Sequence, residues 1–262
     1  MGIDRKPLIA GNWKMNLNHL QAIAFVQKLA WNLADTNHDF TAVDVALFPP
    51  FTDLRSIQTL ISADNLPIAF GAQDLSRHDS GAFTGEISGA FLSKLGCSYV
   101  IVGHSERRTL HGETDEVVSA KVVAALRNDL VPIVCVGETA DDLEQHGPST
   151  TPVAQLAAAL AAVTSVTDIV VAYEPVWAIG SGVAATPDHA EAVAARLRDV
   201  VADRLGDQVA NETRVLYGGS VTASNIVSFM SEPNIDGALV GGASLTISEF
   251  SSIARYQKRV EV

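Results

Sequence analysis

Short runs of apolar residues, many of them β-branched, recur along this chain, and longer stretches of mixed polarity separate them. Runs that are apolar at nearly every position, rather than at alternate positions, are typical of strands buried on both faces of a parallel sheet. The pattern therefore predicts eight strands, at residues 8–13, 45–48, 67–72, 99–103, 132–137, 169–174, 214–219 and 237–242.

The stretches between these runs carry the signals of helices. Thr114, followed by Asp and Glu, is a typical helix start, and Pro187 suits the first turn of another helix because proline fixes a helical φ. Together with apolar spacing, these signals predict helices at residues 17–33, 53–61, 114–130, 152–163, 187–205 and 244–255.

Alternation of this kind over 262 residues predicts the α/β class, and within it a closed (β/α)8 barrel built on a parallel eight-stranded sheet. An open doubly wound sheet is the alternative, but it usually has fewer strands and a GxGxxG turn after the first. Here the first strand runs into GNWKMN. No linker rich in Pro, Gly or Ser divides the chain, so residues 1–262 are expected to form a single domain.

The composition and net charge of the chain indicate which kinds of partner it disfavours. Hydrophobic residues make up 47% of the chain, and 18 Lys and Arg against 30 Asp and Glu give a formal net charge of −12. This charge opposes binding to nucleic acid or to anionic membranes, so any anionic ligand needs a local positive site. Neither a signal peptide nor an apolar run of about 18 residues is visible, and we expect a cytoplasmic protein.

The cysteines and histidines suggest no metal chemistry. Only Cys97 and Cys135 occur, both among small or apolar neighbours, and the seven histidines form no HExxH-type pair. We therefore expect neither a disulfide framework nor a bound metal. The redox sensitivity of the two thiols depends on their exposure, which a sequence does not reveal.

Polar residues at the ends of the predicted strands are the candidates for chemistry, because (β/α)8 barrels carry their active sites there. Asn12 and Lys14 follow the first strand, His104 and Glu106 follow the fourth, and Glu174 ends the sixth. A carboxylate after four apolar residues is a poor choice for core packing, and its desolvation is expected to make it more basic. The start of a helix at His104 would favour a neutral ring that donates a hydrogen bond.

Glycine pairs follow the last two strands, as Gly218–Gly219–Ser220 and Gly241–Gly242. Either pair alone is an ordinary tight turn, but the loops after strands seven and eight of such barrels commonly bind phosphate through backbone N–H groups. A base, an imidazole and a lysine beside a phosphate site suit proton abstraction next to a carbonyl through an enediolate.

These residues stand in motifs that resemble the triosephosphate isomerase family and occur in that family's order: GNWKMN, GAFTGE, IVGHSERR, GETDE, AYEPVWAIGSG, LYGGSV and LVGGASL. The resemblance runs from about residue 8 to residue 245. A single motif such as YGGSV would be weak, whereas AYEPVWAIG together with GHSERR is highly specific.

The resemblance implies a TIM barrel that interconverts dihydroxyacetone phosphate and D-glyceraldehyde 3-phosphate without a cofactor. Glu174 would carry the proton between C1 and C2, and His104 would be a neutral electrophile, an arrangement for which this family is the established example. Lys14 would offset the charge of enediolate and phosphate, and Asn12 would donate to a substrate oxygen. Glu106 would orient Lys14 or assist proton relay.

The family pattern also implies how the substrate is enclosed. Backbone N–H groups of Gly180, Gly241 and Gly242, together with Ser220, would hold the phosphate. Residues 175–185 would form a mobile lid, and this family's loop is a standard example of closure that excludes water.

The long connection 73–88 resembles the family's dimer loop. Its tip, Thr84, would enter the neighbouring subunit near Lys14, so an isologous homodimer is expected. A tetramer is the alternative assembly.

Three departures from the family pattern avoid the proposed catalytic residues. Val183-Ala184-Ala185 stands at the distal end of the lid where Lys-Thr-Ala is common, with Ser181 in place of the usual Thr. The helix after the long loop begins Ser88-Gly89 rather than Ser-Pro, and residues 140–150 lack a common surface salt-bridge pattern.

Two other functions remain alternatives. One is a barrel that isomerises a different sugar phosphate, and the other is a catalytically silent barrel that serves in binding or adhesion.

Overall fold

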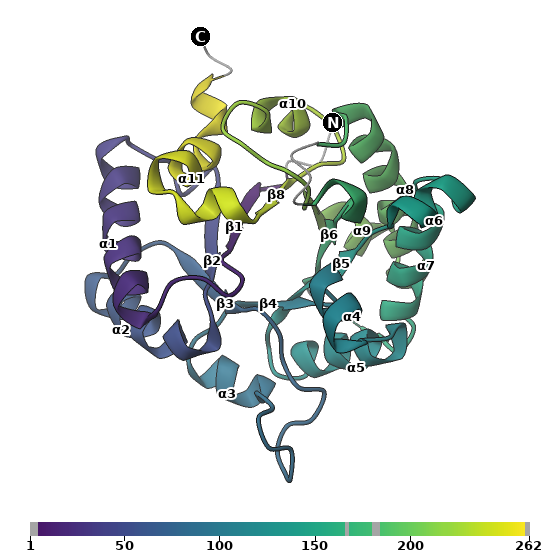
Figure 1. Ribbon diagram of the computed structural model, residues 1–262, viewed down its shortest axis with the longest axis horizontal. Helices are drawn as coiled ribbons and strands as arrows, with labels where there is room; N and C mark the ends of the chain where they lie inside the picture. The colour runs from purple at the N-terminus through teal and green to yellow at the C-terminus, as the bar shows by residue number, and fades with distance from the viewer. Residues whose placement is uncertain (1–4, 166–167, 180–183, 260–262) are drawn as a thin grey trace.

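The strands form a closed parallel barrel. The computed structural model describes residues 5–165, 168–179 and 184–259 (Figure 1). Each strand pairs with the next, and β8 pairs with β1, which closes the sheet. The strands are β1 (Leu8–Asn12), β2 (Asp44–Phe48), β3 (Ala69–Ala72), β4 (Tyr99–Val102), β5 (Val131–Val136), β6 (Val170–Tyr173), β7 (Arg214–Tyr217) and β8 (Gly237–Val240). The predicted (β/α)8 barrel is confirmed.

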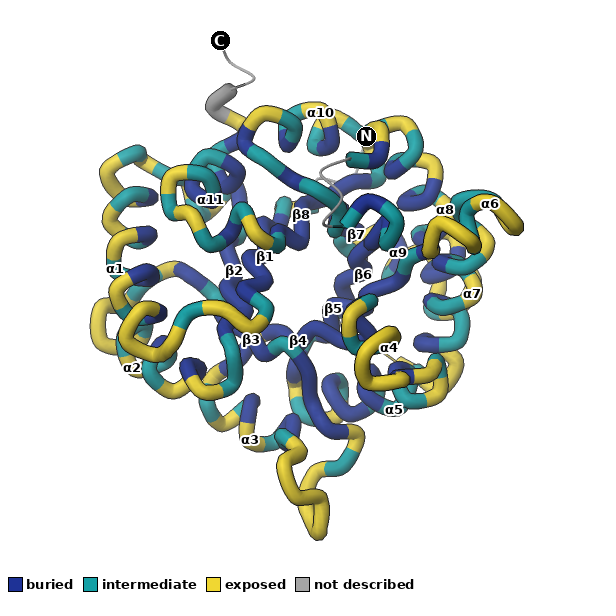
Figure 2. The backbone as a smooth tube through the Cα atoms, viewed as in Figure 1, coloured by how far each residue is buried: buried dark blue, intermediate teal, exposed yellow. Residues whose placement is uncertain are grey.

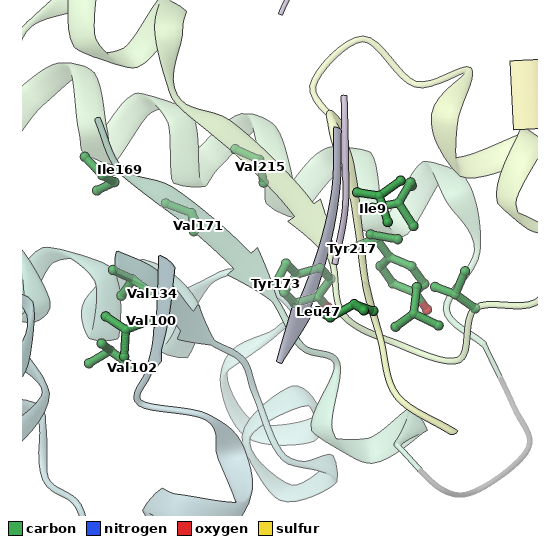
Figure 3. Packing of buried hydrophobic residues seen from close by; sticks show 14 of the residues in the cluster. Ile9, Leu47, Val100, Val102, Val134, Ile169, Val171, Tyr173, Val215 and Tyr217 are labelled. Atoms are coloured by element: carbon green, nitrogen blue, oxygen red, sulfur yellow. The ribbon is translucent and has the colours of Figure 1, made fainter. Parts of the chain in front are cut away.

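Alternate residues of each strand pack in two separate apolar layers. Leu8 and Ala10 belong to a cluster drawn from strands alone, which fills the inside of the barrel. Ile9 between them belongs to the larger cluster that also includes the helices. Figure 3 shows side chains of this outer layer, and Figure 2 shows the strands buried along most of their length. Burial on both faces explains why the strand sequences are apolar without alternation.

Helices surround the barrel (Figure 1). They are α1 (His19–Asp35), α2 (Leu54–Asp64), α3 (Gly89–Lys94), α4 (Ser105–His111), α5 (Asp115–Leu126), α6 (Ala140–His146), α7 (Thr150–Ala159), α8 (Pro187–Leu205), α9 (Asp207–Glu212), α10 (Ile226–Met230) and α11 (Ile247–Ala254). The predicted long helices are present, with ends shifted by a few residues. The short helices α6, α9 and α10 were missed because they have two turns or fewer and little apolar periodicity. In the described part of the chain no helix combines the length and apolar character needed to span a membrane.

The loop 73–88 extends away from the barrel between β3 and α3 (Figures 1 and 2). Its base is closed by a hydrogen bond from the Ser76 N–H to the Ile87 carbonyl oxygen at 2.7 Å. Within it, the rings of His78 and Phe83 stack with centroids 3.9 Å apart, and residues 79–86 are exposed. The segment is therefore an ordered projection.

Candidate active site

Most of the predicted strand-end residues converge on one cavity of about 360 Å³ at the carboxyl ends of the strands, whereas Glu106 is not among its lining residues. Asn12 ends β1, Glu174 directly follows β6, and His104 comes two residues after β4. The cavity is lined by these three residues and by Lys14, Ile179, Gly218, Gly219, Ser220, Val221, Thr222, Leu239, Gly241, Gly242 and Ala243. A cavity of this volume matches a small ligand.

Glu174 is only 2% exposed, and both of its carboxylate oxygens have partners. Oε2 accepts a hydrogen bond from the backbone N–H of Ser105 at 3.0 Å, and Oε1 lies 3.0 Å from Nε2 of His104. Gly218 leaves room for this side chain, since a Cβ there would lie 2.9 Å from Cγ of Glu174. The carboxylate is therefore held by directed donors in a buried place.

The hydrogen bonds around His104 define its tautomer. His104 caps α4, and its Nδ1 accepts a hydrogen bond from the backbone N–H of Glu106 at 3.2 Å. A ring nitrogen that accepts a hydrogen bond carries no proton, so in the neutral ring the hydrogen sits on Nε2. That N–H faces Glu174 and the cavity. The neutral donor expected at this helix start is the form that these contacts favour.

Lys14 is held by contacts with three other residues. Its backbone has a positive φ of 52°, and its N–H donates to Oδ1 of Asn12 at 3.0 Å. Its Nζ lies 2.6 Å from Oε1 of Glu106, and Nε2 of Gln73 donates to its carbonyl oxygen at 2.7 Å. Gln73 also donates to the carbonyl oxygen of Phe48 at 2.8 Å.

Sequence reasoning missed Gln73, although it directly follows the third strand. The criterion that selected the other strand-end residues would have selected it as well. The apolar residues Ile179, Val221 and Leu239, which line the cavity, were also missed because nothing distinguishes them from core residues in the sequence.

The glycine turns after β7 and β8 reach the same cavity. Ser220, Gly241 and Gly242, the residues expected to hold the phosphate, all line it. Gly180, expected to contribute a further N–H, lies outside the described residues, as do Ser181 and Val183. The far end of the predicted lid is described from Ala184 onward, and the N–H of Ala185 donates to the hydroxyl of Tyr217 at 3.1 Å.

Both thiols are buried and free. Burial raises the pKa of Cys97 to about 12. Burial also raises the pKa of Cys135, and the nearby Glu174 carboxylate adds to that rise. Because the thiolate is the reactive form, burial and these pKa shifts disfavour reaction of either thiol. Among the described residues, no group of three His, Cys, Asp or Glu side chains is arranged to hold a metal ion.

A parallel barrel with a buried carboxylate facing an imidazole N–H at its strand ends defines the class as a TIM-barrel enzyme with acid–base groups. The chain matches the sequence profile of triosephosphate isomerase over residues 7–257. It is 69% identical to the triosephosphate isomerase of Leifsonia xyli subsp. xyli over 98% of this chain and 99% of that protein. It is 54% identical to the triosephosphate isomerase of Mycobacterium ulcerans, with 96% and 97% of the two chains covered. The corresponding protein of Streptomyces avermitilis is also 54% identical, with 97% and 98% covered. The chain belongs to the triosephosphate isomerase family.

Proposed function

We propose that this protein interconverts dihydroxyacetone phosphate and D-glyceraldehyde 3-phosphate by proton transfer through an enediolate. Family membership supports the reaction and the isomerase class. The observation that carries the chemistry is the 3.0 Å contact between Glu174 and His104 Nε2, with Nδ1 occupied by a backbone N–H. It pairs a base with a neutral hydrogen-bond donor in one cavity.

Glu174 acts as the base that moves the proton between C1 and C2. In the structure its two oxygens accept hydrogen bonds from the Ser105 N–H and from the ring of His104. A substrate carbonyl oxygen that takes the Nε2–H of His104 replaces one of these contacts and frees the carboxylate to approach carbon. The donor that held the base then stabilises the negative charge that develops on the substrate oxygen.

Lys14 and Asn12 assist from the first strand end. Because Oδ1 of Asn12 accepts the Lys14 N–H, its Nδ2 amide is the end that donates to a substrate oxygen. The Lys14 ammonium offsets the charge of phosphate and enediolate, and Glu106 orients it through their 2.6 Å ion pair. In a chain with net charge −12, this local cation gives the anionic substrate a favourable place to bind.

The phosphate is held by Ser220, Gly241 and Gly242, with Gly180 completing the set as the family pattern implies. The first three line the cavity on the side of β7 and β8, which supports this assignment. A lid over residues 175–185 stays a prediction, because residues 180–183 lie outside the described part.

A coupled assay of the purified protein with both trioses tests the function. Glu174→Gln keeps the shape but removes the base, and kcat is expected to fall by about 10²- to 10⁴-fold. Glu144→Gln makes the same change at an exposed position of α6 and is expected to match the unmodified protein. Equal rates for Glu174→Gln and the unmodified protein would remove Glu174 from its role. Faster turnover of a five- or six-carbon phosphate, or no turnover at all, would favour the two alternative functions.

We further infer a homodimer formed through loop 73–88, with Thr84 near Lys14 of the neighbouring subunit. Support comes from the ordered, projecting loop and from exposed apolar side chains on both expected surfaces. Phe83 beside the loop tip is 41% exposed, and Met15 next to Lys14 is 94% exposed. The buried free cysteines fit a reducing compartment, which supports the expectation of a cytoplasmic protein.

A further inference from the structure

A second group of polar side chains lies behind the base, outside the cavity lining. Glu138 follows β5 and is fully buried. Its Oε1 accepts a hydrogen bond from the Tyr173 hydroxyl at 2.8 Å and another from the Trp177 indole N–H at 2.7 Å. Its Oε2 has no hydrogen-bond partner among the described residues. Such a buried carboxylate depends strongly on each donor that it has.

His189 reaches this group from the first turn of α8. Its Nε2 lies 3.0 Å from the Tyr173 hydroxyl and 3.8 Å from Oε1 of Glu138. Its ring is nearly parallel to that of Tyr173 and meets the Trp177 indole edge-on, with centroids 5.7 Å apart. The histidine therefore touches every member of the group.

The direction of these hydrogen bonds follows from proton counting. The Tyr173 hydroxyl has one hydrogen and donates it to Glu138, so its contact with His189 requires the ring N–H to donate to the hydroxyl oxygen. The result is a chain of donors from His189 to Tyr173 to Glu138. Burial raises the pKa of Glu138, while the Trp177 and Tyr173 hydrogen bonds oppose that rise.

Glu138 in turn holds the backbone that follows the base. The N–H of Val176 donates to the carbonyl oxygen of Glu138 at 3.0 Å. The N–H of Glu174 donates to the carbonyl oxygen of Val136 at 2.8 Å. Segment 136–138 is thus joined to residues 174–177 by two backbone hydrogen bonds and by the hydrogen bond from the Trp177 indole to Glu138. Gly137 permits this close contact, since a Cβ there would lie 1.7 Å from the Glu174 carbonyl oxygen.

We propose that His189 is a positioning residue of the isomerase reaction, an inference that rests on the function proposed above. Its ring N–H keeps the Tyr173 hydroxyl on Glu138, and Glu138 keeps Trp177 and the backbone after Glu174 in place. His189 touches no reacting atom, and its effect reaches the base through these contacts.

Kinetics of His189→Ala and His189→Gln test the proposal. Loss of the ring is expected to lower kcat about five- to tenfold with KM changed less than about twofold, because base placement rather than substrate binding is disturbed. Glutamine retains an N–H donor and is expected to recover most of kcat. Arg196→Ala, on the exposed face of α8, is the control and is expected to leave kcat and KM unchanged.

A second measurement needs no activity. In protein labelled with fluorotryptophan, the Trp177 resonance is assigned by its loss in Trp177→Phe. His189→Ala is expected to shift or broaden this resonance and to leave that of Trp31 unchanged. In His189→Gln the Trp177 resonance is expected to return to its position in the unmodified protein. Variants that lower only the midpoint of thermal unfolding, with kcat, KM and the Trp177 resonance unchanged, overturn the proposal. An inactive unmodified protein would defeat the proposed function, while the resonance would still report whether His189 positions Trp177.

Discussion

At the scale of single residues, the site depends on where side chains are missing as much as on where they are present. The Glu174 carboxylate lies beside Gly218 in a space that any side chain at 218 would occupy. Gly218 also donates its N–H to the Tyr173 carbonyl oxygen at 2.7 Å, and this hydrogen bond fixes the backbone at 218 close to Glu174. The position of the base therefore requires glycine at the end of the neighbouring strand.

Gly218→Ala is expected to displace the Glu174 carboxylate and lower kcat about 10- to 100-fold, because small errors in the placement of a base are costly. The added Cβ would lie 2.9 Å from Cγ of Glu174 and 3.1 Å from the Tyr173 carbonyl oxygen. Steady-state kinetics measures the effect, and circular dichroism verifies that the barrel is folded. A kcat within twofold of the unmodified protein would show that the side chain relaxes without loss.

At the scale of elements, a buried ion cluster joins three parts of the chain around α4, the helix that His104 caps. Lys121 of α5 is 6% exposed, and its Nζ lies 2.6 Å from both Asp74 Oδ1 and Glu113 Oε1. Arg107 of α4 pairs with the same two carboxylates at 3.0 and 2.6 Å. Burial raises the pKa of Asp74, whereas at Glu113 burial is outweighed by Lys121 and Arg107 and the pKa is lowered. The two cations contact separate oxygens of Asp74, whereas both meet Glu113 at Oε1 and leave its Oε2 without a hydrogen-bond partner among the described residues.

Lys121→Met is expected to lower the free energy of unfolding by about 3–5 kcal/mol, since it leaves two buried carboxylates with Arg107 as their shared cation. Urea denaturation followed by circular dichroism measures this change. Lys28→Met, at an exposed position of α1, is the matched control and is expected to stay within about 0.5 kcal/mol. A loss below 1 kcal/mol in Lys121→Met would mean that the cluster relaxes or admits water.

At the scale of the whole molecule, closure of the barrel brings distant residues together. The Lys14–Glu106 ion pair joins positions 92 residues apart, and the Gln73 contact with Lys14 joins positions 59 apart. The loop that supplies Gln73 continues into the predicted dimer contact. Assembly and catalysis are therefore expected to be coupled through this loop.

The unmodified protein is expected to show a mass of twice 27.7 kDa in light scattering. Thr84→Arg places a cation at the exposed loop tip, where the dimer hypothesis brings it beside the partner's Lys14, so dissociation and at least a tenfold loss of kcat are expected. Gln145→Arg adds the same charge at an exposed position of α6 and is expected to leave the dimer intact. A Thr84→Arg variant that stays dimeric and active would place the interface elsewhere.

Much of this protein follows from the order of residues along the chain. Apolar runs interrupted by helical segments predicted the eight parallel strands, because strands covered on both faces need apolar residues at every position. The polar residues after those runs predicted the lining of one cavity, since parallel strands in a barrel end at the same rim. Asn12, Lys14, His104, Glu174 and Ser220 all reach it, as do Gly241 and Gly242.

Other features depend on contacts between residues far apart in the chain, which no local pattern encodes. The proton on Nε2 of His104 follows from the backbone of α4, and the place of Glu174 follows from the space at Gly218. The group of Glu138, Tyr173, Trp177 and His189 forms only when β5, β6 and α8 pack side by side. Residue types and their order suffice for the fold and the candidate groups, whereas hydrogen-bond direction and burial arise from the packed barrel, because both depend on neighbours in space.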